Sequence, residues 1–338
     1  MDPPGRRSMV DVALQSRGFV SMEALARARA MDRFRVSDAV FRHLTRAAAL
    51  GVLLLLSGVI ASLMIGSLPA IRTFGFEFLV SSRWNPVTEI FGATPAIYGT
   101  LITSAIAMLF AVPIGLMIAF FLTELCPQWL RRPIGIAIEL LAGIPSIIYG
   151  IWGLFVFAPF LQATLQPFLI ASLGNLPGIG PAFGGPPYGI GILTAGLILA
   201  IMVLPFITSI SRDVFEAVPG VLKEAAYGVG CTTWEVVRSV VMPYARVGVI
   251  GGIMLGLGRA LGETMAVTFV IGNAHRIAAS ILAPGTTISA TIANEFTEAV
   301  GDLYTSALIA LGLILFVITF FVLAAARYML LRIERRIG

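Results

Sequence analysis

Apolar residues gather along the chain into six long runs that polar segments separate. The runs lie near residues 47–68, 97–122, 134–157, 189–211, 247–272 and 303–326. A helix needs roughly 20 apolar residues to cross the hydrocarbon core of a bilayer, and each run is about that long or longer. This length favours helices over the strands of a membrane barrel, which are about 10 alternating residues long. The pattern predicts an all-α integral membrane protein with six transmembrane helices.

The composition also indicates a membrane protein. Hydrophobic residues make up 58% of the chain and charged residues only 12%, whereas about a quarter of a typical soluble domain is charged. The first 46 residues are polar and arginine-rich, without the apolar stretch of a cleavable signal peptide. We therefore expect the first span to direct insertion into the membrane.

Arginine placement predicts the orientation, because cytoplasmic loops carry an excess of Lys and Arg. With the N-terminus inside, the outer segments hold only Arg72, Arg83 and Arg276, while the inner segments hold the arginines within 6–46, 131–132, 212–246 and 327–336. We expect a multi-pass membrane protein with both termini on the cytoplasmic side. The net charge of +5 then lies beside membrane lipid, and it does not call for nucleic acid as a partner.

These features divide the chain into four parts, and none of them predicts a disulfide, a metal site or a cofactor. The parts are a cytoplasmic N-terminal segment at 1–46 with a basic amphipathic helix over 20–46, a first transmembrane helix and periplasmic segment at 47–96, a core transmembrane domain at 97–327 with a cytoplasmic loop at 212–245, and a basic cytoplasmic tail at 328–338. Anionic lipid would hold the amphipathic helix on the membrane surface. Both cysteines, Cys126 and Cys231, fall on the inner side, so we expect them to stay reduced.

A proline interrupts the third run. Pro145, within AGIPSIIYGIWG, removes a backbone hydrogen bond and permits a bend. The segment that follows, at 161–189, has no charged residue and is dense in Gly and Pro. A seventh crossing there would reverse the arginine bias downstream, so we expect an outside loop or a re-entrant segment.

Local signals in the loop between the fourth and fifth runs predict two short helices. Pro219 suits the first turn of the first helix, and Gly228 or Gly230 suits its end. Residues 232–235 (TTWE) form a capping-box pattern that begins the second helix, and Pro243 is expected to stop it. Such a pair on the cytoplasmic face is shaped to fit a groove in a partner, although on spacing alone an ordinary structured loop is the better explanation.

The fifth run contains two ionisable residues near its middle, within GLGRALGETMAV at 256–267. A charge at the bilayer centre costs roughly 2.5–3.5 kcal/mol on insertion scales, so Arg259 and Glu263 must face protein or water. One helical turn apart, they can neutralise each other as a buried pair. Alternatively, they line a translocation path in which the guanidinium binds an oxyanion and Thr264 adds a hydroxyl. We favour the path, since charges within spans are most often functional.

Small residues in the same run repeat every fourth position, at Gly248, Gly252, Gly256 and Ala260. A face of this kind lets a neighbouring helix approach closely. We expect it to serve packing.

The cytoplasmic loop resembles the EAA motif of ABC importer permeases. Glu224-Ala225-Ala226 is followed by three residues, Gly230, nine residues and then Val240-Val-Met-Pro243, where the usual I-x-L-P ending is conservatively altered. In that family the loop is the coupling helix that docks into an ATPase subunit. The resemblance therefore assigns ATPase coupling to Glu224, Ala225, Ala226, Gly230 and Pro243.

Two further segments resemble the membrane subunits of phosphate importers. They are GRALGETMAVTFVIGN at 258–273 and IPSIIYGIWGL at 144–154. Sulfate and molybdate permeases typically carry GEFG where this chain has GETM at 262–265. The likeness extends from the first span to the end of the chain, which is identified as a member of the binding-protein-dependent transport system permease family. It implies a type I ABC importer permease with the MetI-like fold.

The resemblance implies a membrane-spanning subunit of an ATP-driven phosphate importer that works by alternating access. The implied partners are a second permease subunit (PstA-like), two ATPase subunits (PstB-like) and a periplasmic phosphate-binding protein (PstS-like). ATP would be hydrolysed by the partner, since the chain has no GxxxxGK[ST] motif, and no catalytic residue is expected. Arg259, Glu263 and Thr264 would line the substrate path.

Two other functions stay open at this point. One is a permease for another oxyanion, such as sulfate or molybdate. The other is an ion-coupled secondary transporter or a membrane enzyme, since secondary transporters also use broken helices and midplane charges. The EAA loop counts against the secondary transporter. The two histidines, His43 and His275, fall on opposite sides of the membrane in the predicted topology and cannot form one catalytic set.

Overall fold

The computed structural model describes residues 9–334, with side chains at 37–328 and 330–332. The chain divides into two compact units, Met1–Ser62 and Leu63–Gly338. Parts of the predicted N-terminal segment and basic tail, residues 1–8 and 335–338, lie outside the described residues. The backbone of 20–46 is helical as predicted, while its amphipathic pattern falls largely on side chains that are not described.

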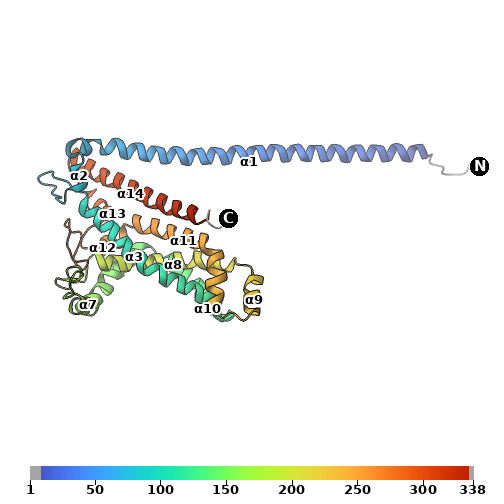
Figure 1. Ribbon diagram of the computed structural model, residues 1–338. Helices are drawn as coiled ribbons and strands as arrows, with labels where there is room; N and C mark the ends of the chain where they lie inside the picture. The colour runs from blue at the N-terminus through green and yellow to red at the C-terminus, as the bar shows by residue number, and fades with distance from the viewer. Residues whose placement is uncertain (1–8, 335–338) are drawn as a thin grey trace, which may run out of the picture. The chain divides into compact units, whose positions relative to one another are not determined.

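The described chain consists of helices joined by turns and loops (Figure 1). In chain order they are α1 Met9–Phe74, α2 Glu77–Val80, α3 Thr94–Phe120 with the π-helical turn η1 Phe121–Leu125, α4 Gln128–Ala142, α5 Ser146–Trp152 with the π-helical turn η2 Gly153–Phe157, α6 Ala158–Ala163, α7 Leu165–Leu173, the 3₁₀ turn η3 Gly180–Phe183, α8 Ile192–Glu216, α9 Gly220–Gly228, α10 Thr233–Val236 with the π-helical turn η4 Val237–Val241, α11 Met242–Gly262, α12 Met265–Val270, α13 Ile288–Glu295 and α14 Asp302–Glu334.

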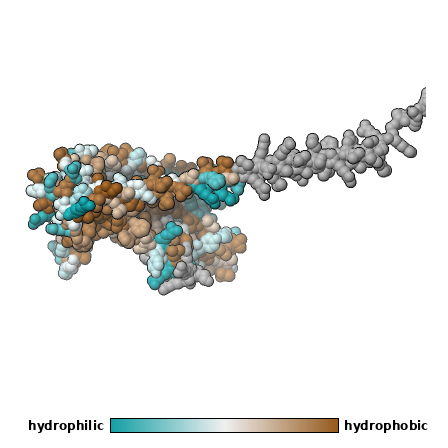
Figure 2. Space-filling model, turned by 90° about the horizontal axis from the view of Figure 1, so that it is seen from above, coloured by the Kyte–Doolittle hydropathy of each residue, from teal (hydrophilic) through white to brown (hydrophobic). Residues whose placement is uncertain are grey.

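Six helical stretches of the described chain are long and apolar enough to cross a membrane. They are Ser37–Phe74, Thr94–Leu125, Ser146–Ala163, Ile192–Glu216, Thr233–Gly262 and Asp302–Arg332. Many large apolar side chains on them are exposed, as expected for surfaces that face lipid, and apolar residues cover much of the face seen in Figure 2. The prediction of an all-α membrane protein with six spans is confirmed.

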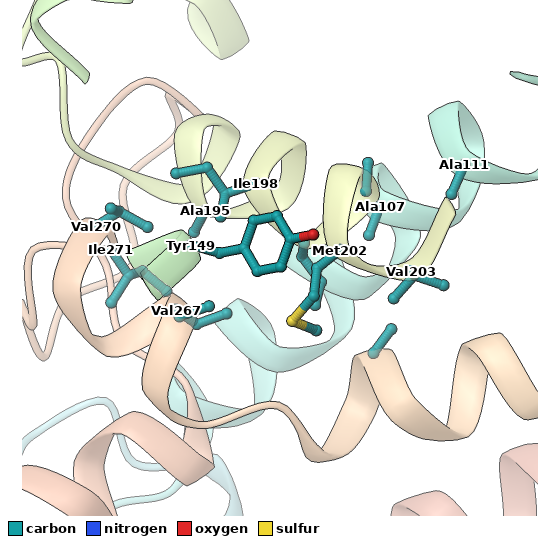
Figure 3. Close-up of a cluster of buried hydrophobic side chains, with 14 of the residues drawn as sticks. Ala107, Ala111, Tyr149, Ala195, Ile198, Met202, Val203, Val267, Val270 and Ile271 are labelled. Carbon is teal, nitrogen blue, oxygen red and sulfur yellow. The ribbon is translucent and has the colours of Figure 1, made fainter. Parts of the chain in front are cut away.

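Helix α8 forms the centre of the Leu63–Gly338 unit. Its side chains Ile198, Leu199 and Val203 are fully buried, and they belong to a core cluster that also contains Ala107 of α3 and Val267 of α12. Figure 3 shows this cluster, in which α3, α5, α8 and α12 each contribute side chains. Because lipid is itself apolar, close packing holds these helices together more than the hydrophobic effect does.

The small residues of α11 pack against α8. A Cβ atom added at Gly248 would lie 2.6 Å from Val214, one at Gly252 would lie 2.9 Å from Ile210, and one at Gly256 would lie 3.0 Å from Ile207. A larger side chain at these positions would push the two helices apart. The packing role predicted for this face is confirmed.

The third span differs from the predicted run at 134–157. Helix α4 ends at Ala142, and a new helix begins at Ser146 and continues through α5, η2 and α6 to Ala163. The break follows from Pro145, which has no N–H for a helical hydrogen bond and disfavours the helical conformation of the residue before it. The crossing is therefore shifted toward the C-terminus.

The uncharged segment at 161–189 contains the short helix α7 and the turn η3. It folds back on itself, because the buried side chain of Gln166 accepts a hydrogen bond from the Gly189 backbone N–H at 2.8 Å. The segment is not among the six candidate spans of the described chain. This arrangement agrees with the expectation that the chain does not cross the membrane a seventh time here.

Candidate functional site

The fifth apolar run, at 247–272, is broken at the residues that carry its charges. Helix α11 ends at Gly262, Glu263 is extended with φ −69° and ψ 133°, and α12 begins at Met265. Glycine has a low helix propensity, which favours an end at this point. The carboxylate of Glu263 accepts a hydrogen bond from the Ala266 N–H at 3.4 Å and so satisfies one of the free donors at the start of α12. The prediction of one continuous helix over 247–272 is wrong, although Arg259 and Glu263 still lie one turn apart.

Arg259 lies one turn before this break and is held by an aromatic ring. Its guanidinium carbon lies 4.4 Å from the centroid of the Phe206 ring of α8. Such a cation–π contact stabilises by about 0.5–2 kcal/mol, depending on how dry the site is. No ion pair joins Arg259 to Glu263 among the residues that the structure describes, and the buried Nε atom of Arg259 has no hydrogen-bond partner there. The ring thus holds the cation while leaving donor capacity unused.

The helices that follow the two breaks, α5 and α12, lie against each other. A Cβ atom added at Gly150 of α5 would lie 3.1 Å from the Cα atom of Ala266 in α12, so the two backbones approach closely. The Tyr149 hydroxyl donates to the carbonyl oxygen of Leu141 at 2.8 Å and thereby satisfies an acceptor on the far side of the Pro145 break. Irregular backbone at membrane depth is tolerated where protein covers it or where it lines a cavity.

Tyr149 also belongs to the core cluster that packs against the start of α12. Its ring sits between side chains of α8, such as Ala195 and Met202, and Val267 of α12 (Figure 3). Neither Tyr149 nor Phe206 was singled out from the sequence, because their roles depend on contacts between different spans.

Thr264 completes the break, and its hydroxyl donates to the carbonyl oxygen of Gly262 at 3.4 Å. Arg259, Glu263 and Thr264 are each partly buried. The three predicted path residues thus lie together at the break between α11 and α12. A guanidinium beside unwound backbone and a hydroxyl has the donors to bind an oxyanion.

The two short helices expected between the fourth and fifth spans are present, as α9 and α10. Pro219 precedes α9, and Gly230 in the turn that follows has φ +91°, a conformation that favours glycine. Both halves of the capping box form: Thr232 N–H donates to Glu235 at 2.7 Å, and Glu235 N–H donates to the Thr232 hydroxyl at 3.4 Å. The local signals that predicted this loop are confirmed.

Pro243 does not stop the second helix as predicted. Helix α10 continues through the π-helical turn η4 into α11, and Pro243 lies in the first turn of α11. Proline cannot donate the hydrogen bond of a regular helix and its ring clashes with the carbonyl four residues earlier. The wider π turn just before it accommodates both effects, since a π turn changes the hydrogen-bond register.

The loop presents apolar side chains to its surroundings. Glu224 and Ala225 are exposed, whereas Ala226 is partly buried against the core. Beside them lie large exposed apolar residues: Val221, Leu222, Tyr227, Val229 and Trp234. Val229 alone is 82% exposed. Several large apolar side chains exposed on one loop indicate a site that binds another protein.

A second polar cluster lies at the opposite end of this unit, near α2 and α13 (Figure 1). The Glu295 carboxylate accepts hydrogen bonds from Trp84 Nε1 at 2.7 Å and from the Tyr304 hydroxyl at 2.6 Å, and it lies 2.6 Å from His275 Nε2. The Trp84 and His275 rings stack with their centroids 5.3 Å apart. The cluster joins the loop after α2, the loop after α12, α13 and α14. We call these four residues the Glu295 cluster.

The Glu295 cluster makes the stability of the protein depend on pH. Burial alone raises the pKa of Glu295, but the contacts with His275, Tyr304 and Trp84 outweigh it, and the pKa is lowered below its ordinary value. The ionised carboxylate therefore stabilises the fold above the unfolded pKa of about 4.3, and this stability is lost as pH falls from there through the lower folded value. We expect Glu295→Gln to lower stability by about 1.5–3 kcal/mol at neutral pH, because hydrogen bonds to charged groups contribute this much.

The measurement is thermal unfolding of purified protein in detergent, followed by circular dichroism at neutral pH and near pH 4. The gap between native and variant protein should shrink at the acidic pH. Glu77→Gln, at an exposed carboxylate of α2, is the matched control and should leave the midpoint unchanged. An equal loss at both pH values would contradict a role for the ionised carboxylate.

Comparisons with known proteins give one consistent result. Residues 111–335 match the family described as binding-protein-dependent transport system inner membrane component. The phosphate transport system permease protein PstC of Mesorhizobium japonicum is 71% identical over 306 residues, which cover 90% of this chain and 94% of that protein. The protein of the same name from Pasteurella multocida is 58% identical over 303 residues, again 90% and 94% of the two chains.

Among solved structures, a bacterial alginate ABC transporter in complex with an alginate-bound periplasmic protein contains a chain of similar fold. The TM-score is 0.58 at 18% sequence identity, and the match covers 86% of this chain and 94% of that one. At this identity the likeness concerns the fold alone.

Proposed function

Because the chain belongs to the family of binding-protein-dependent transport system inner membrane components, we propose that it is a membrane-spanning permease subunit of an ATP-driven phosphate importer. The observation that carries the substrate is the identity of 71% over nine-tenths of the chain to a phosphate permease. The fold is that of a MetI-like permease with six spans. A permease for sulfate or molybdate, and an ion-coupled secondary transporter, are therefore not favoured.

The proposal includes an orientation in a bacterial inner membrane. The α9 end of the unit would face the cytoplasm and the end with the Glu295 cluster would face the periplasm. The bias of arginine toward the segments on the α9 side supports this orientation. Both termini would then lie in the cytoplasm.

The loop at 212–245, which we call the coupling loop, would dock into a separate ATPase subunit. Its exposed apolar residues and the exposed Glu224 and Ala225 support this role, together with Ala226, Gly230 and Pro243, which shape the loop. ATP would be hydrolysed by two copies of that partner, and this chain would transmit the resulting movement. A second permease subunit and a periplasmic phosphate-binding protein would complete the importer.

Phosphate would bind at the break in the fifth span. Arg259 has an unpartnered buried Nε, and it is not neutralised by an ion pair to Glu263 within the described chain. In the outward-open state the guanidinium would attract the anion, Thr264 would donate a hydrogen bond, and Glu263 would hold the start of α12. Because Glu263 carries the same charge as phosphate, it would also limit how tightly the anion is held, which favours release.

Uptake of radiolabelled phosphate tests the proposed function. The proteoliposomes would contain this chain, the second permease, the ATPase and the binding protein, with sulfate and molybdate present as competitors. We expect uptake that requires ATP and that neither competitor reduces. ATP-driven uptake of another solute would overturn the substrate, and uptake without ATP in a verified assembly would overturn the ATP-coupled mechanism.

A further inference from the structure

The only lysine of the chain, Lys223, forms a buried ion pair that ties the coupling loop to the second span. Its Nζ atom lies 2.6 Å from Glu124 Oε1. The side chains of Lys223 and Glu124 are 18% and 6% exposed, so water screens the pair weakly. Lys223 is on α9, and Glu124 is on the π-helical turn η1 that ends the second span. One contact thus joins two elements 99 positions apart in the sequence.

The same ammonium group also reaches the fourth span. Lys223 Nζ donates to the carbonyl oxygen of Phe215 at 3.4 Å. Directly beside it, the rings of Phe120 and Phe215 stack with their centroids 4.4 Å apart and an interplanar angle of 10°. Phe215 is fully buried. The two stacked rings therefore join α3 to α8, and Lys223 connects this junction to α9.

A further hydrogen bond continues from the junction toward the broken third span. Arg131 of α4 donates from Nη2 to the Thr123 carbonyl oxygen of η1. Helix α4 leads to the Pro145 break, after which α5 lies against α12. Contacts between α9 and the site at Arg259 thus run through packed elements, through which coupling between distant sites can be carried.

We propose that Lys223 is a positioning residue for ATP-driven transport, and that its ion pair with Glu124 carries the movement of α9 to the second and fourth spans. The inference rests on the proposed function, in which α9 is moved by the ATPase. Most of α9 is otherwise exposed, and apart from the packing of Ala226 on the core the ion pair is its main side-chain contact with the spans. A buried pair is weak evidence for stability, because apolar residues often stabilise as well, whereas a charged pair fixes one register between two elements.

The test compares phosphate imported with ATP hydrolysed, in proteoliposomes that contain the whole importer. In Lys223→Met, ATP hydrolysis should persist, while the phosphate imported per ATP should fall by roughly fivefold or more, as expected when ordinary coupling between two sites is lost. Glu124→Gln, which keeps an acceptor oxygen and removes the charge, should have a smaller effect of the same kind. The double variant Lys223→Glu with Glu124→Lys should regain coupling.

Controls separate this role from a loss of stability. Arg42→Met removes the cation of an exposed ion pair with Asp38 on α1 and should leave the ratio unchanged. An unchanged ratio in Lys223→Met and Glu124→Gln would overturn the inference alone, as would a parallel fall in hydrolysis and uptake that the double variant does not restore. Absence of ATP-dependent uptake with the native chain would overturn the proposed function and the inference with it.

Discussion

Replacing Arg259 with glutamine should reduce phosphate uptake by about 10- to 100-fold, because a hydrogen bond to a charged group contributes about 1.5–3 kcal/mol. The change removes the charge and most of the donors and leaves a shorter, neutral polar side chain. The guanidinium lies 4.4 Å from the centroid of the Phe206 ring. It forms no ion pair within the described chain, so the fold does not depend on its pairing with a carboxylate. The loss should therefore appear in transport and leave assembly intact.

The measurement is ATP-dependent uptake by importers of equal, verified composition. Arg42→Gln, an exposed change on α1, is the charge-matched control. Phe206→Leu should have an intermediate effect, since it removes the ring that orients the guanidinium but keeps every donor. Full uptake by Arg259→Gln would show that Arg259 does not contact the anion.

Replacing Gly99 with alanine should lower the free energy of unfolding by about 3 kcal/mol, at the upper end of overpacking costs. A Cβ atom at this position would overlap the carbonyl oxygen of Thr286. Because both groups belong to backbone, neither can rotate away. The neighbouring Thr100 hydroxyl accepts a hydrogen bond from the Ile288 N–H at 3.0 Å, and we expect this bond to lengthen when α3 and α13 separate.

Thermal unfolding in detergent, followed by circular dichroism, checks this prediction, with size-exclusion chromatography to measure the folded fraction. Gly58→Ala in α1 is the control, because no other atom lies within 4 Å of an added Cβ there. A midpoint that is the same in the Gly99 and Gly58 variants would contradict the close approach between α3 and the segment before α13.

Much of the fold could be predicted because the bilayer imposes simple constraints on the sequence. Length and hydropathy are enough to find six spans, since any spanning helix must satisfy its backbone hydrogen bonds internally. The coupling loop was equally accessible, because a capping box at 232–235 and a glycine with positive φ at position 230 act locally. The α8-facing side of α11 followed from the spacing of its glycines.

The details that were missed depend on contacts between spans. Hydropathy does not distinguish a continuous helix from one broken at Glu263, because Glu263 and Thr264 interrupt the apolar run in either case. Pro243 has a strong local preference to end a helix, yet a π turn and packing against the core carry the helix past it. The candidate site likewise includes Phe206 of α8, whose ring contacts Arg259, and Tyr149 of α5, which packs beside α12. Nothing in the sequence around either residue indicates these contacts.

The tryptophans of the chain give it natural optical reporters at both ends of the bundle. Trp234 is 67% exposed within the coupling loop, so its emission should move to shorter wavelength if the proposed ATPase subunit covers it. Trp84 is stacked on His275 at the opposite end, where its emission responds to changes in the imidazole ring. Once the other two tryptophans, Trp129 and Trp152, are replaced by phenylalanine, these two indoles would report the proposed docking at either end of the bundle without an attached dye.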